Sequence, residues 1–293
     1  MPPPPIIDLP PPLIVPHLKE GDHEMPENNR PVSLLPVLSK VIEKLALQQY
    51  TNFLSEKNCL TNHQSGNKRY HSTETLGLLV SDHLFNAIDE KKITAMVLID
   101  LSKAFDSICH STLLKKLNWF KSYLTSREQS TRIESTVSTS LIVTHGVPQG
   151  SILGPLLFNI YMNDMPEVVE NSLAESFVDD SKIFLSFSIT EIEKALSLIS
   201  CDLRKVAEWC CANYLLINPD KTKFVIFGTR QLLARLGDVT IPFLGKDLSP
   251  LPSCMDLRVI FDRYLSLNEH IGYLSSSLLG KLCQINRVRH LFT

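Results

Sequence analysis

Residues 93–101 carry the sequence ITAMVLIDL, an apolar and β-branched run that closes on an acidic residue, Asp100. Such a run is typical of a buried β-strand. An aspartate is rarely enclosed in a core without a partner, and a carboxylate at the end of a strand normally faces a cleft where loops and ligands gather. The stretch therefore predicts a buried strand that presents Asp100 to a site.

A second acidic feature lies in residues 175–187, ESFVDDSKIFLSF, which predict two short strands joined at Asp179-Asp180. Crowded carboxylates raise one another's pKa unless a cation neutralises them. Aspartate oxygens suit Mg²⁺, which is usually held by one or two carboxylates plus substrate phosphates. If the fold brings Asp100 and Asp179 together, they can form a two-metal site for phosphoryl transfer. From the residues alone a simpler alternative stays open, because Asp-Asp is also a common turn dipeptide and a strand-terminal Asp often caps a helix.

The rest of the chain alternates between helical and extended patterns. A hairpin is expected in a Thr- and Val-rich segment, a turn and a strand follow the longest helix, and short strands come before the last helix. This order predicts an α+β fold in which helices cover one face of a small antiparallel sheet. The expected helices are 34–54, 76–88, 155–163, 190–214 and 268–293, and the expected extended segments are 131–143, 215–228 and 240–267.

Composition is that of an ordinary globular protein. The 293 residues include 29 Lys and Arg against 31 Asp and Glu, a net charge of −2, with 44% hydrophobic and 20% charged residues. These values exclude a wholly disordered chain, and the charge is unusual for a compact nucleic-acid-binding domain, which is normally basic. No apolar run approaches the roughly 18–20 residues of a membrane helix.

The amino-terminal sequence MPPPPIIDLPPP has neither the basic region nor the apolar core of a signal peptide. We therefore expect a protein of the cytoplasm that is neither secreted nor embedded in a membrane. Residues 1–16 are rich in proline, which disfavours a helix or a central strand, and predict an irregular tail.

Three segments resemble the palm motifs of reverse transcriptases, and their order and content are closest to non-long-terminal-repeat retrotransposons of the LINE and jockey-like kind. The resemblance runs from about residue 14 to residue 290. It implies an RNA-directed DNA polymerase with the right-hand fold of fingers, palm and the start of a thumb. The three segments are VLIDLSKAFDSICH (97–110), GVPQGSILGPLLFNIYMND (146–164) and SFVDD (176–180); NNRPVSLLPVLSKVIEKL (28–45), HQSGNKRYHSTET (63–75) and LLINPDKTKFVIF (215–227) agree as well.

The resemblance also implies a division of the chain and a set of ligands. Behind the tail of residues 1–16 we expect fingers at 17–92, a palm with interleaved fingers elements at 93–240, and a primer grip with a partial thumb at 241–293. The implied partners are an RNA template, a DNA primer and deoxynucleoside triphosphates. The implied cofactor is Mg²⁺ or Mn²⁺.

Residue roles follow from the same resemblance. Asp100 and Asp179 are expected to bind the metal ions, with Asp180 as a weaker third ligand. Lys221 matches a lysine that can protonate the leaving pyrophosphate as a general acid; a solvated surface lysine is the equal alternative.

Further residues are expected to contact substrate. Phe105 matches a ring under the incoming sugar that excludes a 2′-hydroxyl, with a core position on a helix face as its alternative. Asp106 is interpreted as structural, and the turn at 257–259 as the primer grip. The remaining expected contacts are Gln149 and Gly150 with nucleotide or template, Lys68 and Arg69 with the triphosphate, and Arg30 with the template strand.

The sequence departs from the family pattern at several points. The segment STLLKKLNW between His110 and Phe120 is short, and could shift Asp100 relative to Gln149. The family usually has Gly-Phe-Arg where this chain has Gly66-Asn67-Lys68. It usually has glycine at the position of Arg258, and often alanine at the position of Val178. Two alternative hypotheses therefore stand beside the polymerase: an inactive retroelement-derived fragment that at most binds nucleic acid, and a protein-interaction module with PPPPIIDLPPP as a polyproline ligand.

Overall fold

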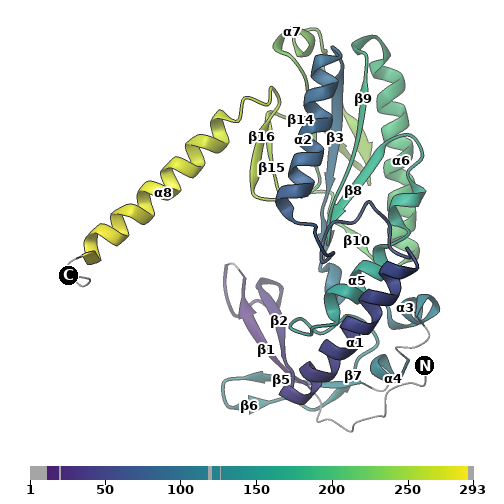
Figure 1. Ribbon diagram of the computed structural model, residues 1–293, viewed down its shortest axis with the longest axis vertical. Helices are drawn as coiled ribbons and strands as arrows, with labels where there is room; N and C mark the ends of the chain where they lie inside the picture. Colours follow the sequence, from purple (N-terminus) through teal and green to yellow (C-terminus); the bar gives the residue numbers. More distant parts are fainter. Residues whose placement is uncertain (1–11, 20, 118–120, 126, 290–293) are drawn as a thin grey trace.

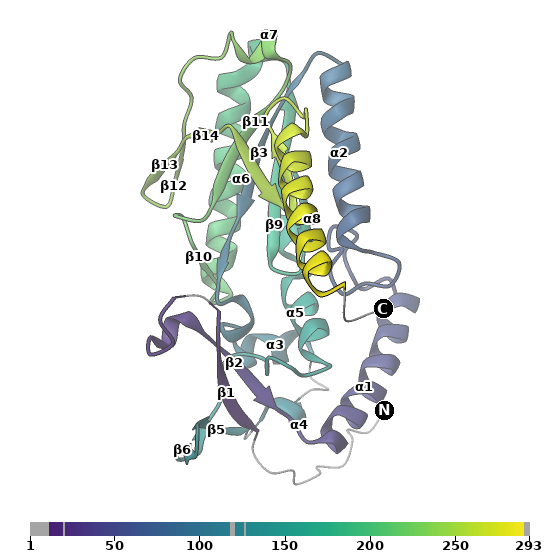
Figure 2. The same ribbon diagram turned by 90° about the vertical axis from the view of Figure 1, so that its left-hand side faces the viewer.

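The computed structural model describes residues 12–19, 21–117, 121–125 and 127–289 (Figures 1 and 2). Its main sheet has the strand order β14-β11-β3-β9-β8. Every neighbouring pair is antiparallel except β14 and β11. The strands are β3 (Ile93–Ile99), β8 (Leu173–Phe177), β9 (Asp180–Phe187), β11 (Lys223–Phe227) and β14 (Pro250–Leu251). The strand predicted from ITAMVLIDL is thus the middle one.

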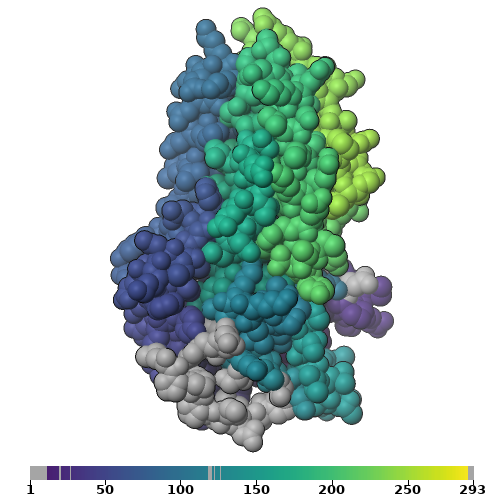
Figure 3. Space-filling view, turned by 90° about the vertical axis from the view of Figure 1, so that its right-hand side faces the viewer, coloured from purple at the N-terminus to yellow at the C-terminus, as the bar shows by residue number. Residues whose placement is uncertain are grey.

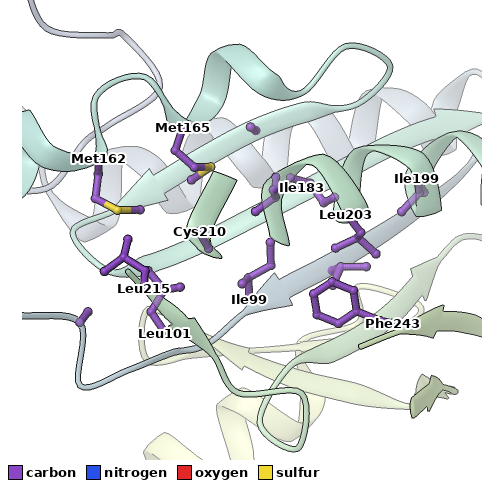
Figure 4. Close-up of a cluster of buried hydrophobic side chains, with 14 of the residues drawn as sticks. Ile99, Leu101, Met162, Met165, Ile183, Ile199, Leu203, Cys210, Leu215 and Phe243 are labelled. Carbon is purple, nitrogen blue, oxygen red and sulfur yellow. The ribbon is translucent and has the colours of Figure 1, made fainter. Parts of the chain in front are cut away.

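Helices cover both faces of this sheet, rather than the one face expected from the sequence. Ile99 on β3 and Ile183 on β9 face α6 (Ile192–Ala212), where they meet Ile199 and Leu203 (Figure 4). On the other face Met96 and its neighbours form a second core with α2 (Thr73–Asp89). Because successive strand residues point to opposite faces, a strand that is apolar throughout requires a cover on both sides.

A second sheet and α1 (Val37–Glu56) both lie at the lower end of the molecule (Figures 1 and 2). Its order is β2-β1-β5-β6, with β7 also paired to β5. The strands are β1 (Leu13–Leu18), β2 (Asn29–Leu34), β5 (Glu128–Ile133), β6 (Thr136–Val137) and β7 (Leu141–Ile142). The hairpin expected at 131–143 is therefore present as β5–β7.

The expected irregular tail of residues 1–16 is wrong for its last part, since Leu13–Leu18 form a strand between β2 and β5. Pro16 is tolerated there because β5 pairs only with Leu13 and Ile14. The missing N–H of Pro16 consequently leaves no gap in the β1–β5 ladder. Residues 1–11, including most of the PPPPIIDLPPP stretch, lie outside the described residues.

Short elements join the two sheets and carry the segment after Asp100. These are β4 (Leu101–Ser102), η2 (Ala104–Asp106), α3 (His110–Lys116), α4 (Lys121–Leu124), α5 (Gly154–Met162) and β10 (Leu216–Ile217). The loop before α5 is docked onto this segment by backbone hydrogen bonds from Gly146 to Ile108 (2.7 Å) and from Val147 to Phe105 (3.0 Å). The short segment after His110 is therefore compatible with close contact between the two motifs.

The carboxyl-terminal third adds two hairpins and a long helix. Hairpin β15 (Ser253–Asp256) and β16 (Val259–Asp262) packs beside the main sheet, and α8 (Asn268–Val288) projects away from the body with none of its residues buried (Figure 1). The other elements are η1 (Pro26–Asn28), η4 (Met165–Val168), η5 (Ile189–Glu191), α7 (Arg230–Leu233), β12 (Ile241–Phe243) and β13 (Lys246–Leu248). Figure 3 shows α2 and α6 along the upper body, with the α1 region below them.

Among the described helices none combines the length and the apolar character needed to cross a bilayer. The expected ranges for fingers, palm and partial thumb stay predictions. Helix α2, which falls within the range expected for the fingers, packs on the main sheet.

Candidate active site

Three carboxylates gather at one end of the main sheet. The antiparallel pairing of β3 with β9 runs to Ile99 opposite Ser181, so Asp100 and Asp180 occupy the next position across the two strands. Residues opposite each other in such a ladder have Cα atoms about 4.5–5.5 Å apart. The hairpin turn consists of Val178 and Asp179, since Asp180 already pairs with Phe177. The expected turn at Asp179-Asp180 is thus displaced by one residue, and Asp179 lies at its tip.

The charges of these carboxylates act on one another. Burial is the main cause that raises the pKa of Asp179, and the Asp100 charge raises it further, while the cationic side chains of Arg30 and Lys19 oppose the shift. Burial, followed by the charge of Asp179, raises the pKa of Asp180 to about 6. The site is therefore a cluster in which the fully ionised state is unfavourable until a cation enters.

A cavity of about 1150 Å³ opens on this cluster. Asp100, Asp180 and Lys221 line it, together with parts of α2, of the β15–β16 hairpin and of α8. The turn that carries Lys221 is fixed to the strand end, because the Asn218 N–H donates to the Asp100 carbonyl over 2.9 Å. Asp100, Asp180 and Lys221 thus face one space, and Asp179 is not among the described residues that line it.

The Gly-rich loop 146–154 meets the segment after Asp100 through two side chains. Gln149 donates from Nε2 to both carboxylate oxygens of Asp106, at 2.9 and 3.1 Å. Burial raises the pKa of Asp106, and the Gln149 hydrogen bond opposes that shift. Asp106 therefore orients the Gln149 amide so that Oε1 points away from the carboxylate. This contact agrees with the interpretation of Asp106 as a structural residue.

Phe105 lies half-buried in η2, and its ring stacks on Phe158 of α5 with centroids 4.6 Å apart. The alternative interpretation of Phe105 as a core residue therefore describes this conformation. Gly150 has φ +106°, and a Cβ there would lie 3.2 Å from the Ser33 carbonyl of β2. Glycine is thus required at 150 both by its backbone conformation and by the close approach of the second sheet.

Three predicted basic contacts differ in their placement. Arg30 on β2 lies near enough to lower the pKa of Asp179, so it belongs to the neighbourhood of the carboxylates. The Lys68 ammonium instead donates to the Thr61 carbonyl at 3.2 Å. The Arg69 guanidinium lies over the Tyr70 ring, 4.7 Å from its centroid. Among the described contacts, Lys68 and Arg69 are not joined to the carboxylate cluster.

The structure adds site residues that the sequence patterns did not single out. The side chain of Gln64 hydrogen-bonds the backbone of Val178 in the turn between β8 and β9. Lys182, two residues after Asp180, forms a buried ion pair with Asp256 of β15. Both contacts join residues far apart in the chain, and the only signal for Gln64 in the sequence is its place in the HQSGNKRYHSTET segment.

The donor set suits a hard divalent cation that shares its coordination with substrate. Within the described residues no three His, Cys, Asp or Glu side chains come close enough to form a complete metal-binding group. Mg²⁺ does not need such a cage, because it usually keeps only one or two carboxylates and takes other oxygens from phosphates and water. Asp100 and Asp179 meet that requirement.

A mainly antiparallel sheet that ends in clustered carboxylates, beside a Gly-rich loop and the strand that carries Arg30, is the palm arrangement expected of a template-directed polymerase. The family profile "Reverse transcriptase (RNA-dependent DNA polymerase)" matches residues 18–248, and the chain belongs to this family.

Relatives in Drosophila support the assignment to retrotransposon reverse transcriptases. The probable RNA-directed DNA polymerase from transposon BS of Drosophila melanogaster is 30% identical over 88% of this chain and 30% of its own length. The RNA-directed DNA polymerase from mobile element jockey of Drosophila funebris is 28% identical over 92% of this chain and 31% of its own length. The chain therefore spans about 30% of these relatives.

Solved structures with a similar trace include telomerase from Candida albicans with a fragment of telomeric RNA. The alignment covers 88% of this chain and 46% of that chain, with 13% identity and a TM-score of 0.46.

Proposed function

We propose that this chain is an RNA-directed DNA polymerase domain of a retroelement, which extends a DNA primer on an RNA template with deoxynucleoside triphosphates. In the reaction the primer 3′-oxygen forms a bond to the α-phosphorus, and the bond from that phosphorus to the pyrophosphate oxygen breaks. The convergence of Asp100 and Asp179 at the end of β3 and the tip of the β8–β9 hairpin is the observation that carries this proposal.

Asp100 and Asp179 would hold Mg²⁺ or Mn²⁺, with Asp180 as the third carboxylate. When bound, such ions stabilise the attacking and leaving oxygens of an in-line phosphoryl displacement. The raised pKa values of Asp179 and Asp180 support this assignment, since a bound cation would remove the repulsion that raises them.

Other residues would bind and orient the substrates. Lys221, which lines the same cavity as Asp100, would give a proton to the leaving pyrophosphate. Gln149, oriented by Asp106, would present Oε1 to the nucleotide or the template. Arg30, whose charge lowers the pKa of Asp179, would contact the template strand.

Two assignments require a local change from this conformation, and the role of Phe105 is limited to one face of its ring. Phe105 would act beneath the sugar only with the ring face that is not stacked on Phe158. Lys68 would have to leave the Thr61 carbonyl to reach a triphosphate, and Arg69 would have to leave the Tyr70 ring. Gly150 needs no rearrangement, because its role is to allow close approach of backbone. The chain would act in the cytoplasm or at nuclear DNA.

The test is primer extension on an RNA template with a DNA primer, in Mg²⁺ and separately in Mn²⁺. Extension by deoxynucleotides that disappears in a folded Asp179→Ala variant is the expected result. A folded wild-type chain that extends no primer would contradict the proposal. RNA titration would then separate a fragment that only binds nucleic acid from one that does not bind it.

A further inference from the structure

Residues 63–66 form an additional strand-like contact beside the catalytic hairpin. Gln64 makes an isolated parallel bridge to Ser176 of β8. The Ser65 N–H donates to the Ser176 carbonyl at 2.9 Å, and the Ser176 N–H donates to the His63 carbonyl at 2.8 Å. A segment that precedes α2 is therefore fixed next to the β8–β9 turn.

The buried side chain of Gln64 binds both backbone groups of one turn residue. The Val178 N–H donates to Gln64 Oε1 at 2.8 Å, and Gln64 Nε2 donates to the Val178 carbonyl at 3.0 Å. The Gly66 N–H donates to the same Oε1 at 2.8 Å. Two donors on Oε1 and one acceptor for Nε2 fix the orientation of the amide.

Val178 needs such support because its backbone is strained. Its φ is +59°, a left-handed conformation that β-branched residues rarely adopt. Of the two residues in the hairpin turn only Val178 has positive φ, which is the pattern of a type II′ turn, where glycine is the usual residue. Strained backbone of this kind persists only where its surroundings over-determine it.

Gly66 leaves the space that this arrangement requires. A Cβ at residue 66 would lie 2.4 Å from both the backbone nitrogen and Cγ2 of Val178. The Gly66 carbonyl in turn accepts from Asn159 Nδ2 of α5 at 2.6 Å. The turn is therefore clamped from the first part of the chain, and the clamp is anchored on the helix that follows the Gly-rich loop.

We infer that Gln64 is a positioning residue for Asp179: it holds Val178 in the left-handed conformation that places the Asp179 carboxylate within the field of the Asp100 carboxylate. The inference rests on the proposed function in assigning Asp179 to catalysis. Gln64 touches no reacting atom and acts only through the turn. Its loss would let the turn relax and move Asp179, and a displacement of about 1 Å can cost roughly 10²-fold in rate.

The experiment compares Gln64→Met, which keeps the length of the side chain but removes its hydrogen bonds, with Gln231→Met on the exposed surface of α7. Primer extension and the affinity for Mn²⁺ are measured for each folded variant. We expect Gln64→Met to lower kcat roughly 10²-fold with a smaller change in the KM for nucleotide. We expect it to weaken Mn²⁺ binding at least about tenfold, and Gln231→Met to match the wild type.

A second substitution separates positioning from a general loss of stability. Glycine adopts positive φ without strain whereas alanine does not, so Val178→Gly added to Gln64→Met should recover at least tenfold in kcat and in Mn²⁺ affinity. Val178→Ala added to Gln64→Met should recover neither. A double variant with glycine that recovers no more than the one with alanine would overturn the inference.

The two proposals fail in different ways. A wild-type chain that binds Mn²⁺ but extends no primer overturns the proposed function. The positioning role of Gln64 is then decided by comparing the Mn²⁺ affinities of the wild type and the variants. If the wild-type chain extends primer and Gln64→Met has the same rate and the same Mn²⁺ affinity, only the positioning role of Gln64 is overturned. A folded wild-type chain that does neither overturns both.

Discussion

Lys182 and Asp256 form an ion pair that is almost completely enclosed, with 1% and 4% of their side chains exposed. Lys182 lies on β9 two residues after Asp180, and Asp256 ends strand β15. The pair therefore fixes the β15–β16 hairpin, which the sequence suggests is the primer grip, to the strand that begins with a carboxylate of the site.

Breaking this ion pair should destabilise the protein strongly. Lys182→Met leaves the Asp256 carboxylate buried without its partner, and removal of one member of a buried pair costs about 3–5 kcal/mol. Adding Asp256→Leu removes the second charge and should restore most of the loss, because apolar replacements of buried pairs are often neutral. Urea unfolding of the two single variants and the double variant measures this; a double variant as unstable as the sum of the singles would contradict it.

The turn between β15 and β16 should be stabilised by glycine. Its two central residues, Leu257 and Arg258, have φ of +46° and +70°, so the turn is of type I′ with side chains that disfavour it. Left-handed backbone costs about 1–2 kcal/mol for a non-glycine residue. Arg258→Gly should therefore raise the free energy of unfolding by about 1 kcal/mol.

Arg132→Gly on the exposed strand β5 serves as the matched control for this substitution. It introduces glycine where φ is not positive and should destabilise by about 0.5–1 kcal/mol. Thermal unfolding of both variants gives the comparison. If the two substitutions shift the midpoint in the same direction, the account of the turn is wrong.

Asp106 should affect nucleotide binding through Gln149. Asp106→Ala removes the acceptor that orients the Gln149 amide, whereas Asp106→Asn keeps an oxygen in its place. A lost hydrogen bond to a charged group is worth about 1.5–3 kcal/mol. We expect the KM for nucleotide in primer extension to rise at least about tenfold in Asp106→Ala and less in Asp106→Asn. Equal effects of the two variants would show that Asp106 acts in another way.

His110 should make the protein less stable as the pH falls. Burial lowers its pKa, with a contribution from the neighbouring Arg127 and His145, although the hydrogen bond of its Nε2 to the Gly146 carbonyl opposes the shift. The unfolded state then binds a proton more readily than the folded state. The stability that depends on neutral His110 is therefore lost as the pH drops through the unfolded value of about 6.5.

Urea unfolding at pH 7.5 and pH 5.5 measures this effect. His110→Gln keeps an N–H donor for Gly146 but does not titrate, so its loss of stability between the two pH values should be smaller than that of the wild type. His83, whose pKa is also lowered by burial, remains in both proteins and contributes equally. An identical pH dependence in the two proteins would show that His110 does not contribute.

The sequence was sufficient to predict the features that depend on local pattern. The apolar run 93–99 is the central strand, and its boundary at Asp100 agrees with the structure. The helix that covers the second face of the sheet was not predicted, although Met96 and Leu98 alternate with residues that pack towards α6. The one polar residue of this strand, Thr94, is itself buried, so the alternation marks no exposed face and the cover by α2 could be seen only in three dimensions.

Contacts between distant segments could not be predicted. Gln64 and Val178 are 114 residues apart, and Lys182 and Asp256 are 74 residues apart. Neither glutamine nor lysine has a local pattern that reveals its partner, because these contacts depend on how the first and last parts of the chain dock on the main sheet. Arg258, which stands where the family usually has glycine, has a positive φ of +70°.

Nucleotidyl transfer by this chain would depend on the metal ions that the carboxylates of Asp100 and Asp179 hold. The most direct test of this claim is the single-turnover rate of one deoxynucleotide added to a primer on RNA, in Asp100→Asn, Asp179→Asn and the exposed control Asp238→Asn. Asparagine keeps the shape and removes the charge, so we predict a rate at least about 10³-fold lower in the first two variants and a wild-type rate in the control. Folded Asp100→Asn and Asp179→Asn variants that incorporate nucleotide at the wild-type rate would contradict the claim.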